Sequence, residues 1–163
     1  MWKNKMNQIA PRVQRHVVLI DAENLSGSGA PDAVDAAHVQ QQLSGVIDDW
    51  ETAFVIVGCS HIAARNVFFQ YPRARHLWQS GDNGADLALL SVLEGEGIDY
   101  RFARITICSG DGIFAEPLAR LVQVGLQATV ISRCGHLSWR LRRAAHRVIE
   151  LPPCPVASEM RVA

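Results

Sequence analysis

The sequence lacks the features of membrane-spanning, secreted and P-loop proteins. No apolar run approaches the ~20 residues that span a bilayer, and the run at Val17–Ile20 is too short for a signal peptide. The glycine-rich segment Ser26-Gly27-Ser28-Gly29 has no Lys-Ser or Lys-Thr after it, as a P-loop would. These absences predict a cytoplasmic protein with no membrane partner.

The chain also has little lysine and no excess of charge of either sign. It contains 2 lysines and 14 arginines, and its net charge is zero, which argues against a uniformly basic surface for nucleic acid. No acid lies between Glu116 and Glu150, a stretch that contains six arginines. Arginine suits bidentate contacts with phosphate, although the bias could equally reflect genome composition.

Cysteine is sparse, and none of the four cysteines has CxxC spacing, so reduced thiols are expected. The pairs Cys59-Ser-His61 and Cys134-Gly-His136 could suggest zinc. However, their strands are predicted to be three positions apart in the sheet, roughly 14 Å. This separation argues against a zinc site.

What the chain does contain is a regular alternation of apolar strands and helical patterns. Strands are predicted at residues 17–20, 53–57, 75–78, 104–109 and 128–132, with a sixth edge strand at 148–151. Helices are predicted from residue 32 and at 61–70, 83–94, 114–124 and 138–146, and a loop at 26–31 follows the first strand. In the helix at 83–94, Leu87, Leu90 and Leu93 are predicted to face the core. The alternation indicates one α/β domain with a parallel sheet at residues 16–151. A basic tail at 1–15 and a flexible tail at 152–163 flank it.

Three aspartates occupy equivalent places in this pattern. Asp21 and Asp111 each follow an apolar strand, and Asp86 opens the helix at 83–94. If the strand order is 3-2-1-4-5, all three reach one crevice at the carboxyl edge of the sheet, where α/β proteins bind ligands. A cluster of acids repels itself unless a cation joins it, and oxygen ligands favour a hard divalent metal.

The segments around these aspartates carry a family resemblance. Asp21-Ala22-Glu23-Asn24-Leu25, the Asp86 helix start and the segment from Ser109 to Phe114 resemble the motifs of the NYN family of PIN-like nucleases. The resemblance extends from Val17 to Leu151. It implies a three-layer α/β sandwich of strand order 3-2-1-4-5 and metal-dependent cleavage of RNA.

By that resemblance, Asp21, Asp86 and Asp111 would be catalytic and would hold Mg²⁺ or Mn²⁺. Asn24 would orient Asp21 or the scissile phosphate, and Ser109 would add a supporting hydrogen bond at the site. One position departs from the family pattern, because Ile113 occupies the place of a further acid. Carboxylates that could compensate are at three positions: Glu23, Asp82 and Glu116.

A basic segment follows the fifth strand and suggests how RNA could bind. Trp139, Arg142, Arg143 and His146 have the spacing of one helix face. An exposed aromatic ring beside arginines suits unpaired bases and phosphates, so single-stranded RNA is the expected substrate. The other interpretation is a Trp139 that tucks into the domain edge, with solvated arginines. Arg133 and His136, nearer the crevice, are further candidates for substrate contact.

Two other functions remain open. The domain could bind RNA without cleaving it, given the missing acid, or it could be a phosphohydrolase on a different α/β fold. The second alternative lacks the Asp-x-Asp-x-Thr motif of haloacid-dehalogenase-type phosphatases, since Asp21-Ala22-Glu23-Asn24-Leu25 has neither the second aspartate nor the threonine. An apolar patch of Phe68, Phe69 and Tyr71 could support a homodimer.

Overall fold

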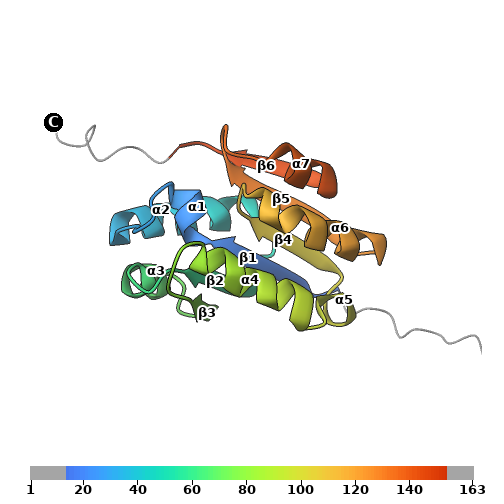
Figure 1. The fold of residues 1–163 in the computed structure, drawn as a ribbon, viewed down its shortest axis with the longest axis horizontal. Helices are drawn as coiled ribbons and strands as arrows, with labels where there is room; N and C mark the ends of the chain where they lie inside the picture. Colours follow the sequence, from blue (N-terminus) through green and yellow to red (C-terminus); the bar gives the residue numbers. More distant parts are fainter. Residues whose placement is uncertain (1–13, 154–163) are drawn as a thin grey trace, which may run out of the picture.

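The computed structural model describes residues 14–153, which form a three-layer α/β sandwich around a parallel sheet (Figure 1). Apart from residues 14, 15, 152 and 153, the predicted tails lie outside the described residues, as does Cys154. The strands are β1 His16–Asp21, β2 Phe54–Cys59, β3 Arg75–Trp78, β4 Arg104–Cys108, β5 Gln127–Arg133 and β6 Arg147–Leu151. The helices are α1 Ala22–Ser26, α2 Ala33–Val46, α3 Ala64–Gln70, α4 Gly84–Gly95, α5 Ile98–Arg101, α6 Ala115–Gln123 and α7 Trp139–Ala144, with a 3₁₀ turn, η1, at Gly112–Phe114.

The sheet has the order β3-β2-β1-β4-β5-β6, and every pair of neighbouring strands is parallel. The predicted order of the first five strands is therefore confirmed, and the sixth strand extends it at one edge. β1 and β4 are neighbours although 82 residues lie between the end of β1 at Asp21 and the start of β4 at Arg104. The chain crosses the sheet between β3 and β4. Such a switch point at the carboxyl ends of two strands is where α/β proteins commonly bind ligands.

Both faces of the sheet are covered, which explains why the strands are apolar throughout. Helices α4, α6 and α7 pack on one face through Leu89, Leu118 and Leu141. Helices α1, α2 and α3 pack on the other face through Leu25, Leu43 and Val67. The strands alternate between the two clusters, so consecutive residues of β1 enter opposite faces.

Several predicted details are wrong. Leu87 was expected to face the core, but it is exposed, and Leu89 and Val92 are buried in its place. The loop expected after β1 contains the short helix α1, and α5 precedes β4. The predicted patch of Phe68, Phe69 and Tyr71 is not continuous, because Tyr71 is only 3% exposed while Phe69 is 81% exposed.

The described cysteines are free, and Cys59 is buried while Cys134 is exposed. Two strands separate β2 from β5, as the argument against zinc required. Between residues 14 and 153, no helix is long and apolar enough to cross a membrane.

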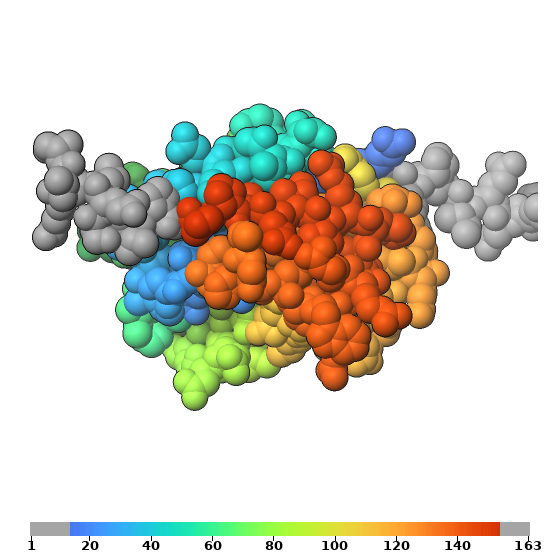
Figure 2. Space-filling view, turned by 90° about the horizontal axis from the view of Figure 1, so that it is seen from above, coloured from blue at the N-terminus to red at the C-terminus, as the bar shows by residue number. Residues whose placement is uncertain are grey.

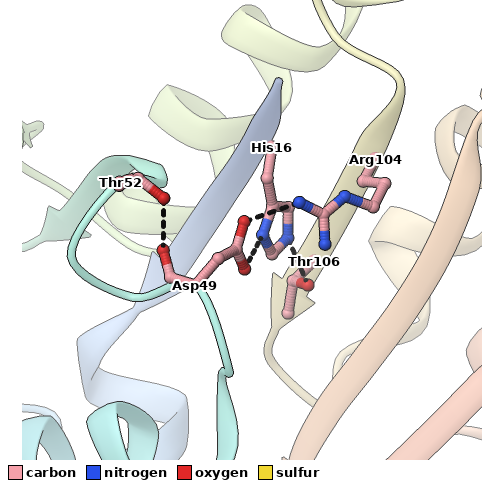
Figure 3. Close-up of polar contacts among 5 residues, drawn as sticks. All are labelled: His16, Asp49, Thr52, Arg104 and Thr106. Atoms are coloured by element: carbon pink, nitrogen blue, oxygen red, sulfur yellow. Dashed lines mark hydrogen bonds and ion pairs between the residues drawn. The ribbon is translucent and has the colours of Figure 1, made fainter. Parts of the chain in front are cut away.

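A polar cluster around the buried side chains of His16 and Thr106 lies at the amino edge of the sheet (Figure 3). The His16 ring lies with Nδ1 2.8 Å from Asp49 Oδ1 and Nε2 2.8 Å from Thr106 Oγ1. Arg104 donates to the other Asp49 oxygen at 2.7 Å. Burial lowers the pKa of His16 despite the nearby carboxylate, so the neutral ring links Asp49 to Thr106.

Replacing Asp49 with alanine should destabilise the protein by about 1–3 kcal/mol, because His16 and Arg104 would lose a charged acceptor. Urea unfolding at pH 7.5 measures the change. Asp48→Ala is the matched control, since Asp48 is exposed and makes none of these bonds. Equal unfolding free energies for the two variants would contradict a stabilising role for the cluster.

Candidate functional site

Asp21 lies at the carboxyl edge of the sheet, where β1 ends and α1 begins. Its side chain is the N-cap of α1, with Oδ1 accepting a bond from the Asn24 backbone N–H at 3.1 Å. Ser109, directly after β4, donates its hydroxyl to Asp21 Oδ2 at 3.1 Å. Asp21 is only 3% exposed, so both carboxylate oxygens are fixed in a largely dry environment.

Asp86, in the first turn of α4, lies beside Asp21 and interacts with it electrostatically. Burial raises the pKa of Asp21 well above its usual value, and the neighbouring Asp86 raises it further. Burial also raises the pKa of Asp86. Two neighbouring carboxyl groups cannot easily ionise together, which agrees with the raised pKa of both.

Two further carboxylates act on this pair. The negative charges of Asp111 and Glu23 both contribute to the raised pKa of Asp86, after the larger effect of burial. Asp111 Oδ1 accepts a bond from the Ile113 N–H at 3.0 Å and caps the 3₁₀ turn η1. Glu23, in the first turn of α1, accepts a bond from the Ser60 N–H at 2.7 Å. Asp86 therefore lies within electrostatic reach of Asp21, Asp111 and Glu23.

The carboxylates do not form a ready-made metal cage. Within residues 14–153, no group of three or more His, Cys, Asp and Glu side chains is arranged to hold a metal ion. One oxygen of Asp111 already accepts a bond from the Ile113 N–H. Burial and mutual proximity raise the pKa values of Asp21 and Asp86, so a cation would compete with protons for this pair.

The structure distinguishes among the three acids that could replace the one missing at position 113: Glu23, Asp82 and Glu116. Glu116 is exposed and pairs with Arg120 one helical turn later, at 2.9 Å. Asp82 is exposed in the loop before α4. Glu23 alone of the three contributes to the raised pKa of Asp86. Sequence spacing could not distinguish these candidates, because the position of Glu23 depends on α1 and on the end of β2.

A network around Gly110 connects three loops that are distant in sequence. The Asn24 side-chain oxygen accepts a bond from the Gly110 N–H at 2.9 Å, and the Gly110 carbonyl accepts one from the Ser138 N–H at 2.8 Å. A methyl group on Gly110 would lie 2.8 Å from the His136 carbonyl carbon, and even closer to its oxygen. Sequence reasoning missed this role of Gly110, for which the Ser-Gly-Asp-Gly segment was the available signal.

The predicted basic face is partly wrong. Helix α7 ends at Ala144, and His146 lies beyond it, where its ring accepts a bond from the Ala128 N–H. Arg142 forms an ion pair with Glu150 of β6, so its charge is already balanced. Trp139 is 64% exposed and does not tuck into the domain edge, and the Arg140 guanidinium lies 5.7 Å from its ring centre. Arg143 is exposed.

Arg133 ends β5 and is half-buried, whereas the His136 side chain is exposed. Three buried polar side-chain atoms of the described residues have no hydrogen-bond partner and lie in the last two residues of a strand or directly after one at this edge: Ser60 Oγ, Ser132 Oγ and Arg133 Nε. Buried polar groups are normally paired, so these atoms are free to bond to a ligand or to water.

Comparisons with known proteins bear only on the fold. No protein-family model and no curated protein matches the chain. A crystal structure of a protein of unknown function from Vibrio parahaemolyticus is similar, with a TM-score of 0.59 and 16% sequence identity. The alignment covers 87% of this chain and 95% of that one. The likeness defines a shared α/β architecture and carries no statement about activity.

Proposed function

We propose that the protein is a cytoplasmic, metal-dependent ribonuclease that cleaves single-stranded RNA. The carrying observation is that the buried Asp21 and the half-buried Asp86 interact, with Asp111 and Glu23 close enough to raise the pKa of Asp86. Acids that raise one another's pKa are costly at neutral pH unless a cation binds among them. The resemblance of the flanking segments to the NYN family of PIN-like nucleases supports the same activity.

The donor set fits a hard divalent cation. It consists of carboxylate oxygens, which Mg²⁺ and Mn²⁺ prefer, and contains no thiolate or imidazole. Asp21, Asp86 and Asp111 would hold the ion, with Glu23 as the fourth acid in place of the one missing at Ile113. The bound metal would activate a water molecule and neutralise charge on a phosphoryl oxygen.

The protein's own groups would keep these ligands in position. Ser109 and the Asn24 backbone each bind one oxygen of Asp21, so the carboxylate cannot rotate freely. The Asn24 side chain fixes the Gly110 peptide and thereby the start of the loop that carries Asp111. Such preorganisation matters because small displacements of a reacting group reduce its rate strongly.

One observation favours a second candidate, an RNA-binding domain without cleavage activity. In the described residues, no three acidic, cysteine or histidine side chains are already arranged to hold a metal. In this alternative, the Asp21–Asp86 pair would keep its proton and the acids would only shape the crevice. Metal binding measured by calorimetry at pH 7.5 separates the two candidates, since only the nuclease needs the ion.

Cleavage of a fluorescent single-stranded RNA should require Mn²⁺ or Mg²⁺ and stop when EDTA is added in excess. The physical reason is that the proposed metal activates the attacking water and neutralises charge on the phosphoryl oxygen. Restored activity after the metal is returned serves as the control for irreversible damage. Undiminished cleavage in EDTA would rule out the proposed mechanism, and hydrolysis of a small phosphate ester without RNA cleavage would revive the phosphohydrolase alternative.

A further inference from the structure

Arg133 crosses from the end of β5 to the last turn of α1. A methyl group placed on Gly27 would lie 2.7 Å from Cζ of the Arg133 guanidinium, closer than any ordinary contact. Gly27 has a φ of 76°, a left-handed conformation that favours glycine, and it is the C-cap of α1. Figure 2 shows the orange segment after β5 beside the blue segment that contains α1. The absence of a side chain at residue 27 therefore leaves the space that the guanidinium occupies.

The charge of Arg133 is not balanced by an acid. Six arginines of the described chain pair with carboxylates within 4.0 Å: Arg73, Arg75, Arg101, Arg104, Arg120 and Arg142. Arg133 has no such partner among residues 14–153, and its Nε is buried without a hydrogen bond. A half-buried cation with an unpaired donor loses solvation that no protein group replaces. An anionic ligand would replace it.

We propose that Arg133 binds a phosphate of the RNA backbone at the carboxyl edge of the sheet. This inference rests on the proposed function and assigns the phosphate-binding group within it. The acids at this edge repel a polyanion, so a nearby positive charge is needed to hold the strand there. A guanidinium binds a phosphate through two parallel N–H donors, and the space left by Gly27 holds the Arg133 guanidinium beside the end of α1.

The same geometry makes Arg133 a better phosphate ligand than the arginines of α7. Arg142 would have to break its ion pair with Glu150 before it could bind RNA. Arg133 has no ion pair to break, and the contact with Gly27 limits its side-chain freedom before the strand arrives. The proposed phosphate site therefore lies between the ends of α1 and β5, on the flank of the crevice away from α4.

The test measures binding of a fluorescent oligouridine in EDTA, so that it does not depend on cleavage. Arg133→Ala should weaken binding about tenfold, the equivalent of one charge-assisted hydrogen bond. The slope of log affinity against log salt should flatten by roughly 0.7, the value for one phosphate contact on a single strand. Arg133→Lys should recover only part of the affinity, because lysine lacks the bidentate fork.

Gly27→Ala should have a similar effect without removing any charge, since its methyl group takes the place of the guanidinium. The matched control is Arg65→Ala, which removes an exposed positive charge from α3 on the opposite flank. Melting temperatures show whether each variant folds. If Gly27→Ala does not fold, the Arg133 variants decide the question. Equal affinities of the Arg133→Ala and Arg65→Ala variants would overturn the proposal, as would failure of the wild-type protein to bind oligouridine at low salt.

Inorganic tripolyphosphate identifies the source of the phosphate. If tripolyphosphate binds through Arg133 while oligouridine binding is indifferent to the substitution, the site takes a small phosphate compound and the proposal is wrong. The outcomes also distinguish this inference from the proposed function. Loss of cleavage in EDTA tests the metal site. RNA binding that depends on Arg133 is measured separately, and it would persist even if the domain never cleaved RNA.

Discussion

Replacing Asp21 with asparagine should raise the melting temperature of the metal-free protein and abolish RNA cleavage. Burial and the neighbouring Asp86 raise the pKa of Asp21 in the folded state. A carboxyl group with a raised folded-state pKa favours folding below its unfolded pKa of about 3.9. This contribution is lost as the pH rises through the folded-state pKa. At neutral pH the charged site therefore destabilises the fold, and asparagine removes the charge while keeping the shape.

The expected gain is about 1–2 kcal/mol at pH 7.5, or about 2–4 °C for each kcal/mol in a domain of this size. The gain should shrink as the pH falls and should vanish well below about pH 3.9, where the wild-type carboxyl group is protonated in both the folded and the unfolded state. Cleavage should fall by several orders of magnitude, because a central metal ligand is lost. Calorimetry at both pH values and a cleavage assay test the two halves of the prediction.

Asp32→Asn is the matched control, since Asp32 caps α2 far from the crevice through bonds to Val34 and Asp35. Asparagine caps a helix as well as aspartate does, so stability and cleavage should both remain close to wild type. A lower melting temperature for Asp21→Asn at pH 7.5 would show that the carboxylate stabilises the metal-free fold. Retained cleavage would place the reaction elsewhere.

Replacing Gly110 with alanine should reduce both stability and activity, although it removes no functional group. The new methyl group would overlap the His136 carbonyl, which belongs to the backbone and cannot rotate away as a side chain could. The loop from Cys134 to Ser138 would have to move, and the bond from the Ser138 N–H to the Gly110 carbonyl would break. Overpacking of this kind costs about 1–3 kcal/mol, and the lost bond adds to it.

Cleavage should fall along with stability, because Asp111 follows Gly110 directly and would shift with it. Gly29→Ala provides the control, since no atom lies within 4 Å of the added methyl group there. Thermal unfolding and initial cleavage rates measured in parallel show whether the two losses occur together. A Gly110→Ala protein with wild-type stability would mean that the loop after β5 adjusts freely.

The sequence predicted the sheet well because each strand is buried on both faces and is therefore apolar throughout. The same information placed Asp21 and Asp111 at the carboxyl edge, since the end of an apolar run marks the end of a strand. Helix α1 was missed because Asp21 is both the last residue of β1 and the N-cap of α1, which leaves no loop between the two elements. Periodicity over five residues is too short to indicate a helix.

Interactions between distant segments could not be predicted. The Arg142–Glu150 ion pair depends on β6 returning beside α7, and the contact between Arg133 and Gly27 depends on how α1 lies over the sheet. Leu87 was misjudged for a related reason. A helix made largely of apolar residues has no clear inner face until its position on the sheet is known.

The polar clusters at the two ends of β1 have an implication for evolution. His16 and Asp49 at the amino edge stabilise the fold, whereas Asp21 at the other edge is expected to destabilise it. The carboxylates of the acidic edge can therefore mutate without unfolding the domain, provided that Gly110 is kept, and new specificities can accumulate there. A mutant library confined to those carboxylates should yield mostly folded proteins, whereas an equally large library of the polar cluster at the opposite edge should yield many that do not fold.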